Sequence, residues 1–137
     1  MGKKLKENKK TVLIVEDNRE ILDLLAQGLS REGYITIKAE DGTKAIAIAS
    51  DIRPDLTILD LNLPDYDGID ILGRLKAMHA SAQVVIISGY GSQDAARSAM
   101  EAGAFDFLTK PFDIDEVYAV VKEALLSEPP IVYSEES

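Results

Sequence analysis

The sequence contains no cysteine and no tryptophan, and it has one histidine among 137 residues. Without cysteine the chain can form neither disulfides nor thiolate metal sites, which suits a reducing compartment. The single histidine, His79, cannot build a histidine metal site, and its place near a predicted helix end indicates a surface role. Metal binding in this chain would therefore depend on oxygen ligands.

Long apolar runs and positive charge are also scarce. No apolar stretch is long enough to span a bilayer, and the lysine-rich start lacks the apolar region of a signal peptide. We therefore expect a cytoplasmic location without membrane insertion. The formal net charge of -9 disfavours direct nucleic acid binding by this chain. Residues 1–10 depart from the acidic balance with five lysines and one glutamate, so we expect a basic tail there.

Strand-like and helix-like patterns alternate along the rest of the chain. Short apolar or β-branched runs cover residues 11–15, 34–38, 56–59, 84–87 and 105–108. After them, residues 21–29, 45–49, 69–78, 92–100 and the segment from Asp113 have helical patterns. Three of the strands are apolar throughout, as expected where helices cover both faces of a parallel sheet. The pattern predicts an α/β fold, (βα)5, with a doubly wound, flavodoxin-like, five-stranded parallel sheet of order 2-1-3-4-5.

The domain boundaries follow from the same pattern. We expect one folded domain over residues 11–126, between the basic tail of residues 1–10 and an acidic C-terminal tail or linker of residues 127–137. Gly33 is predicted to cap the C-terminus of the first helix, and Asp113 with Glu116 to begin the last one. Asp17 could cap the first helix as well as bind a ligand.

Polar residues stand where four of the apolar strands end. Glu16 and Asp17 follow the first strand, Asp60 ends the third, Ser88 follows the fourth and Lys110 lies just past the fifth. In open parallel sheets, ligands bind beyond the carboxyl ends of the strands, where the strand order reverses. With the order 2-1-3-4-5, Asp17 and Asp60 should face each other there, with Ser88 and Lys110 on the next two strands.

These side chains together suit phosphoryl transfer. Crowded carboxylates repel one another unless a cation is present, and Mg²⁺ (or Mn²⁺) fits because it takes one or two carboxylates and keeps several waters. A carboxylate nucleophile, a divalent ion, the Lys110 ammonium and the Ser88 hydroxyl are the groups needed to phosphorylate an aspartate. Asp60 is the best candidate for the nucleophile because it lies between the metal-binding acids and the Ser88–Lys110 side.

Four motifs in this order resemble those of response-regulator receiver domains of two-component signalling. They are Val15-Glu-Asp17, Leu59-Asp-Leu-Asn-Leu-Pro-Asp-Tyr-Asp-Gly68, Ile87-Ser-Gly89 and Phe107-Leu-Thr-Lys-Pro-Phe112. Each alone would be a weak signal, but together they are highly specific and extend over most of residues 11–126. The resemblance implies a regulatory switch in a phosphorelay. Asp60 would accept a phosphoryl group from a sensor histidine kinase or a histidine phosphotransfer protein, and later lose it.

The resemblance also implies roles around Asp60. Asp17 and Asp60 would ligate magnesium together with the backbone carbonyl of Asn62, and Glu16 would assist through water. Lys110 would contact Asp60 and the phosphoryl oxygens. Glutamate at position 16 replaces a commoner aspartate, and its longer arm keeps the charge, so metal binding should survive.

Further residues would transmit the signal. Ser88 would turn toward the phosphoryl group while Phe107 repacks inward, changing the face of the fourth helix, fifth strand and fifth helix that regulates a partner or output domain. Dimerisation on phosphorylation would be compatible with this. Phe107 stands where tyrosine is frequent and lacks the hydroxyl. Pro111 resembles the cis-proline that aims Lys110 into the site, and we expect Tyr90 to shield the phosphoryl group from water.

Two other functions compete with this one. A haloacid-dehalogenase-like phosphohydrolase would place its nucleophile in an Asp-x-Asp pattern after the first strand, where this chain has Glu16-Asp17-Asn18-Arg19. A receiver-like module that binds partners without phosphorylation would not need the intact set of acids, hydroxyl and lysine. Pro129-Pro130 suits a linker, so a stand-alone receiver and a fragment of a longer regulator both stay open.

Overall fold

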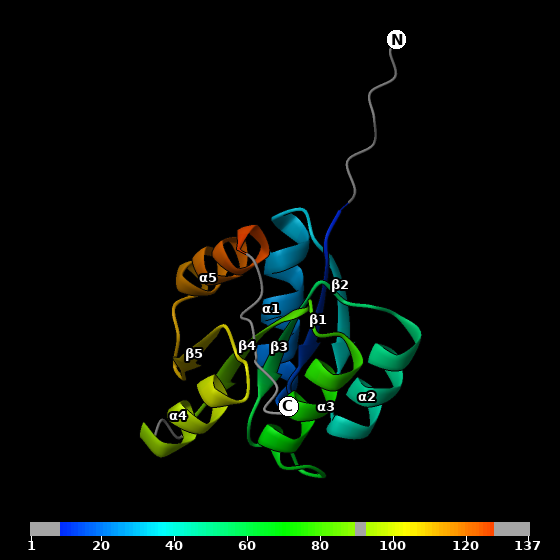
Figure 1. Ribbon diagram of the computed structural model, residues 1–137. Coiled ribbons are helices and arrows are strands. Elements are labelled where there is room, and N and C mark those ends of the chain that lie inside the picture. Colours follow the sequence, from blue (N-terminus) through cyan, green and yellow to red (C-terminus); the bar gives the residue numbers. More distant parts are fainter. Residues whose placement is uncertain (1–8, 90–92, 128–137) are drawn as a thin grey trace.

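The computed structural model describes residues 9–89 and 93–127. Within these residues five strands and five helices alternate (Figure 1). The strands are β1 (Thr11–Val15), β2 (Ile35–Ala39), β3 (Leu56–Asp60), β4 (Gln83–Ser88) and β5 (Asp106–Thr109). The helices are α1 (Arg19–Arg31), α2 (Gly42–Asp51), α3 (Gly68–Met78), α4 (Gln93–Glu101) and α5 (Ile114–Leu126). All strand pairs are parallel and the order is β2-β1-β3-β4-β5, which confirms the predicted fold.

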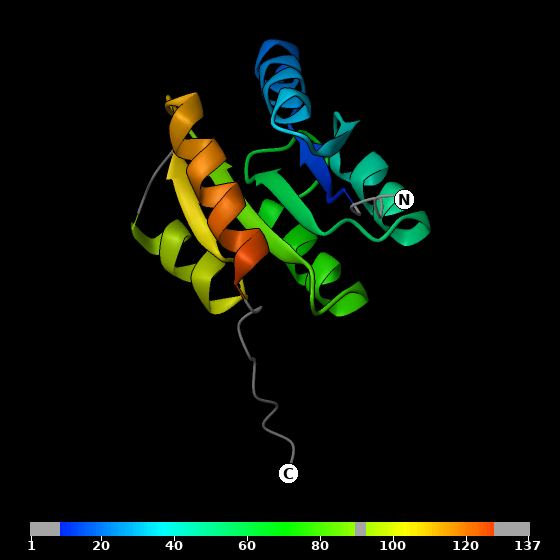
Figure 2. The ribbon, with the colours of Figure 1, turned by 90° about the horizontal axis from the view of Figure 1, so that it is seen from above.

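Helices cover both faces of the sheet. α1 and α5 pack on one face, and α2, α3 and α4 on the other (Figures 1 and 2). In β1, Val12 and Ile14 point to the α1–α5 side, whereas Leu13 and Val15 point to the other, and all four are completely buried. Burial on both sides explains why this strand shows no apolar–polar alternation. Each such side chain stabilises the fold by about 1.5–3 kcal/mol.

The start of α1 differs from the expectation. Asn18, and not Asp17, is the N-cap: its side chain accepts a hydrogen bond from the Ile21 N–H at 3.1 Å. The prediction that Asp17 caps this helix is therefore wrong. The physical reason is that the helix begins one residue later than expected, which leaves the exposed Asp17 carboxylate at the carboxyl end of the sheet.

Most other boundaries agree within a residue or two, whereas α2 begins at Gly42, three residues before the predicted helix of residues 45–49. Gly33 lies just beyond Glu32, the cap residue of α1, and its φ of +102° is one that glycine adopts without strain. Asp113 caps α5 as predicted and accepts a hydrogen bond from the Asp115 N–H at 3.1 Å. The predicted helix over 92–100 begins at Ser92, which lies outside the described residues. No helix in the described part of the chain is long and apolar enough to cross a membrane.

The strand ends matter most for function. Asp60 belongs to β3 and is in register with Ile87, and Ser88 belongs to β4 and is in register with Thr109. Both polar residues are therefore part of the parallel ladder, although the apolar runs stop one residue earlier, at Leu59 and Ile87. The ladder places their backbones at the carboxyl edge of the sheet.

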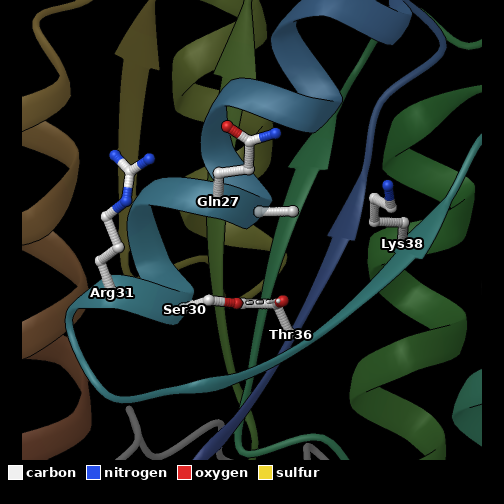
Figure 3. A pocket seen from close by; sticks show the side chains of 6 residues that line it. Gln27, Ser30, Arg31, Thr36 and Lys38 are labelled. Carbon is white, nitrogen blue, oxygen red and sulfur yellow. Dashed lines mark hydrogen bonds between the residues drawn. The ribbon is translucent and has the colours of Figure 1, made fainter.

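An open pocket of about 360 Å³ lies elsewhere, between α1 and the edge strand β2 (Figure 3). A hydrogen bond of 2.9 Å joins the Ser30 and Thr36 hydroxyls across it, and Lys38 at its border pairs with Asp23. Its lining contains none of the residues predicted to bind a metal or a phosphoryl group; it consists of Ala26, Gln27, Ser30, Arg31, Thr36 and Lys38. The pocket is therefore separate from the predicted site.

Candidate phosphoacceptor site

The predicted site residues meet at the carboxyl edge of the sheet. Glu16, Asp17 and Asp60 each offer a carboxylate oxygen, and these oxygens lie within 4.8 Å of one another. The Lys110 Nζ lies 2.8 Å from Glu16 Oε1 and 3.2 Å from Asp60 Oδ2. Ser88 joins the group through Asn62, as described below. Adjacent strands thus bring together residues that are up to 94 positions apart in the sequence, counting from Glu16 to Lys110.

Asp60 is the central carboxylate. It is the last residue of β3, and only 2% of its surface is exposed. Its Oδ1 accepts a hydrogen bond from the Asn62 N–H at 2.9 Å, and its Oδ2 accepts one from Lys110 at 3.2 Å. Because both oxygens have partners, the carboxylate has a defined orientation at the edge of the sheet.

Glu16 is completely buried directly after β1. Its Oε2 accepts a hydrogen bond from the Asn18 N–H at 3.0 Å, and its Oε1 forms the ion pair with Lys110. Burial raises the pKa of Glu16 to about 7, assisted by the nearby charge of Asp60, although the contacts with Lys110 and Asn18 act in the opposite direction. Glu16 therefore changes its charge near neutral pH.

Lys110 reaches the site from the loop after β5. Its backbone N–H donates to the Ser88 carbonyl at 2.8 Å, and the peptide bond to Pro111 is cis, as predicted. Burial by itself lowers the pKa of Lys110, but the hydrogen bond to Glu16 and the negative charges of Asp60 and Glu16 outweigh it and raise the pKa. The side chain therefore stays a cation between two buried carboxylates.

Ser88 and Asn62 are connected through their side chains. Ser88 is 1% exposed, and its hydroxyl donates a hydrogen bond to Asn62 Oδ1 at 3.2 Å. From the sequence we predicted a role only for the backbone carbonyl of Asn62; neither this side-chain contact nor the Glu16–Lys110 ion pair was predicted. Neither contact has a local sequence signal, because the partners stand 26 positions apart in the first and 94 in the second.

Phe107 and Tyr90 were predicted to act in switching and in shielding. Phe107 lies in β5, is partly buried, and packs against the core on the α2–α3–α4 side of the sheet. This places its ring between the sheet edge and the helices, but its movement stays a prediction. Tyr90 lies outside the described residues, so its shielding role also stays a prediction.

Comparisons with known proteins agree with this geometry. The family model for the response regulator receiver domain matches residues 12–122. Sporulation initiation phosphotransferase F of Bacillus subtilis is 41% identical over 114 residues, which cover 83% of this chain and 92% of that protein. Transcriptional regulatory protein PrrA of Mycobacterium tuberculosis is 39% identical over 114 residues, which cover 83% of this chain and 49% of that protein. The chain thus spans about half the length of PrrA.

Solved structures agree as well. The receiver domain of NtrX from Brucella abortus has a TM-score of 0.80 with 40% identity, and the match covers 85% of this chain and 98% of that one.

Receiver domains bind Mg²⁺ at an acidic pocket, and Glu16, Asp17 and Asp60 form an acidic cluster here. The family match, the strand order and the cluster point to one conclusion. The chain belongs to the response regulator receiver domain family and is a phosphoacceptor in two-component signalling.

Proposed function

We propose that Asp60 is the phosphoacceptor. One of its carboxylate oxygens attacks the phosphorus of a phosphohistidine on a sensor kinase or a histidine phosphotransfer protein. The new O–P bond forms as the P–N bond breaks, and the imidazole leaves with the electron pair of that bond. The observation that carries this proposal is the position of Asp60, buried at a strand end beside the other two carboxylates and 3.2 Å from the Lys110 ammonium.

The acidic cluster provides oxygen donors suited to Mg²⁺ or Mn²⁺. The carboxylates of Asp17 and Asp60 and the backbone carbonyl of Asn62 would hold the ion, and Glu16 would assist through a water molecule. The donor set fits because it consists of hard oxygens from two adjacent strand ends, two of them on carboxylates whose charges need a counterion. The bound ion would neutralise charge on the phosphoryl oxygens.

Lys110 also neutralises the negative charge of the phosphoryl oxygens, through its ammonium group. In the structure its ammonium is shared by Glu16 and Asp60. A phosphoryl group on Asp60 offers stronger negative charge at the same place, so Lys110 contacts the phosphoryl oxygens in the phosphorylated state. The flexible four-carbon stem of lysine allows this change of partner without movement of the β5 backbone.

Ser88 and Phe107 convert the chemistry into a surface change. For the Ser88 hydroxyl to turn toward the phosphoryl group, its hydrogen bond to Asn62 Oδ1 must break. Phe107 then repacks inward and alters the face formed by α4, β5 and α5, which regulates an output domain or a partner protein. The names of two relatives, a phosphotransferase and a transcriptional regulatory protein, fit such partners. We further propose that residues 11–126 form the receiver domain and that the protein acts in the cytoplasm. Dimerisation would be one form of output.

Acetyl phosphate with Mg²⁺ tests the chemistry directly. Intact-mass analysis should show one phosphoryl group on the wild-type chain and on the control Asp23→Asn, in which an exposed, lysine-paired aspartate on α1 is changed. Asp60→Asn should show none, and Asp17→Asn should show much less because the metal is held weakly. An adduct that persists in Asp60→Asn would contradict the assignment.

A further inference from the structure

The loop that carries Asn62 is attached to the start of α2, the helix that packs beside α3 on the same face of the sheet. This loop, residues 61–67, connects Asp60 at the end of β3 to α3 and contains Asp65. The carboxylate of Asp65 accepts three hydrogen bonds from the first turn of α2: the N–H of Gly42 at 2.9 Å, the N–H of Thr43 at 3.0 Å and the hydroxyl of Thr43 at 2.8 Å. These three contacts tie the loop to the start of α2.

The start of α2 has a cap of its own. The Asp41 side chain accepts a hydrogen bond from the Lys44 N–H at 2.8 Å, as an N-cap residue does. Asp65 thus adds a second carboxylate to the same helix terminus, where the first backbone N–H groups and the helix dipole favour negative charge. The hydrogen bonds from Gly42 and Thr43 lower the pKa of Asp65, which keeps this carboxylate ionised.

Apolar contact reinforces the attachment. A Cβ atom placed on Gly42 would lie 2.6 Å from Tyr66 Cδ2, so the absence of a side chain at position 42 allows the Tyr66 ring to lie against the helix. The guanidinium of Arg74, on α3, lies 5.6 Å from the centre of the same ring. Residues 65 and 66 therefore bind the first turn of α2 through charge and through packing.

The other side of the loop is connected to the phosphoacceptor. The Asn62 N–H donates to Asp60 Oδ1, and an isolated antiparallel bridge pairs Asn62 with Asp67. The Gly68 N–H donates to the Leu61 carbonyl at 3.2 Å, which closes the loop on itself. A displacement of Asp65 is therefore passed to Asn62 through a short, closed segment of chain.

We propose that Asp65 is a positioning residue for the phosphoacceptor site: by fastening the loop to the N-terminus of α2, it sets where the backbone of Asn62 lies relative to Asp60. The proposal rests on the proposed function, in which the Asn62 carbonyl is a metal ligand. Asp65 itself touches neither the acidic cluster nor Lys110 in any described contact. Its effect on metal binding passes through the loop, as residues that orient metal ligands commonly act.

Asp41 offers a matched control for this role. Asp41→Ala and Asp65→Ala each remove one carboxylate from the same helix terminus, so both should lower the stability of α2 by similar amounts. Only Asp65 also holds the Asn62 loop. A purely structural role of Asp65 would make the two variants alike in every measurement.

The experiment is a Mg²⁺ titration of the full chain, followed by NMR, with amide hydrogen exchange of Asn62 measured first in the metal-free protein. Asp65→Ala should speed exchange at Asn62 and raise the Kd for Mg²⁺ about tenfold, at the low end of the effect of residues that orient metal ligands. Asp41→Ala should leave both quantities unchanged. Asp65→Asn, which keeps one acceptor oxygen, should give a Kd between those of the wild type and Asp65→Ala. If Asp65→Ala does not fold, Asp65→Asn takes its place in the experiment.

The outcomes separate this inference from the proposed function. Equal Kd values for wild type and the Asp65 variants, or equal weakening by Asp41→Ala, would overturn the positioning role of Asp65. A wild-type chain that binds no Mg²⁺ would instead overturn the metal site of the proposed function. In that case exchange at Asn62 still decides the inference: slow exchange that Asp65→Ala leaves unchanged would refute it, and faster exchange confined to the Asp65 variants would support it.

Discussion

Two lysine–carboxylate pairs in this protein have nearly the same length. The Lys110 Nζ lies 2.8 Å from Glu16 Oε1 at the carboxyl edge of the sheet, and the Lys38 Nζ lies 2.9 Å from Asp23 Oδ1 beside the pocket between α1 and β2. Their exposure differs greatly. The side chains of Lys110 and Glu16 are 20% and 0% exposed, whereas those of Lys38 and Asp23 are 51% and 47% exposed.

Burial, and not the distance between the nitrogen and oxygen atoms, determines how strongly the two charges of each pair interact. Two unit charges 4 Å apart interact by about 1 kcal/mol in bulk water and by about 4 kcal/mol at an effective dielectric constant near 20. At the carboxyl edge, the same burial that strengthens the attraction also raises the pKa of Glu16 to about 7. We therefore expect the buried pair to respond to protons, metal ions and phosphoryl groups, and the exposed pair to remain a surface contact.

The largest expected difference appears when the lysine is removed. Lys110→Met leaves Glu16 and Asp60 buried without their cation, and at pH 8 without Mg²⁺ we expect the free energy of unfolding to fall by about 2 kcal/mol. This is below the usual cost of breaking a fully buried pair because Lys110 is partly exposed. Lys38→Met, the matched change in the exposed pair, should cost less than about 0.5 kcal/mol.

Chemical denaturation of both variants and the wild type provides the measurement. At pH 5 the loss in Lys110→Met should shrink because Glu16 is then protonated. Adding Mg²⁺ at pH 8 should also reduce it, since the ion replaces the missing cation. Equal losses in Lys110→Met and Lys38→Met would show that burial does not distinguish the two pairs.

The site could be located from the sequence because parallel strands end at one edge. That rule, together with the strand order, was enough to place Asp17, Asp60, Ser88 and Lys110 near one another. It could not predict that Lys110 binds the buried Glu16 as well as Asp60. That choice depends on the length of the glutamate side chain and on the free energy of removing both groups from water.

The attachment of Asp65 to α2 could not be predicted either. An aspartate between a proline and an aromatic residue in a loop resembles an ordinary solvated turn residue. Its partners Gly42 and Thr43 stand 23 and 22 positions earlier in the sequence and belong to α2. Pattern and periodicity describe elements and their order, whereas such contacts depend on the path of a loop over the folded surface.

A second prediction concerns pH. With a pKa of about 7, Glu16 is mostly protonated at pH 6 and mostly ionised at pH 8 in the metal-free protein. If Glu16 supports the metal as proposed, the Kd for Mg²⁺ should be about tenfold higher at pH 6 than at pH 8, corresponding to one proton released. Titrations at several pH values check this, and Glu16→Gln should flatten the profile.

The same group links pH to stability. The pKa of Glu16 in the folded state lies above its ordinary value of 4.5, so the folded metal-free protein binds the proton more tightly than the unfolded chain. This contribution to the free energy of unfolding is complete below about pH 4.5 and is lost as the pH rises through about 7.

The Mg²⁺ titrations have an outcome that would contradict the role of Glu16. A wild-type Mg²⁺ affinity that is independent of pH between 6 and 8 would mean that Glu16 does not take part in metal binding.

The smallest effect belongs to the exposed pair. A double-mutant cycle with Asp23→Asn and Lys38→Met should give a coupling free energy below about 0.5 kcal/mol. About 1 M salt should abolish it, because the screening length is then close to 3 Å. The corresponding cycle with Glu16→Gln and Lys110→Met should keep most of its coupling in the same salt, since Glu16 has no exposed surface through which ions could screen it. If both couplings disappeared together, solvent would reach the carboxyl edge as freely as the surface of α1, and the raised pKa of Glu16 would lose its physical cause.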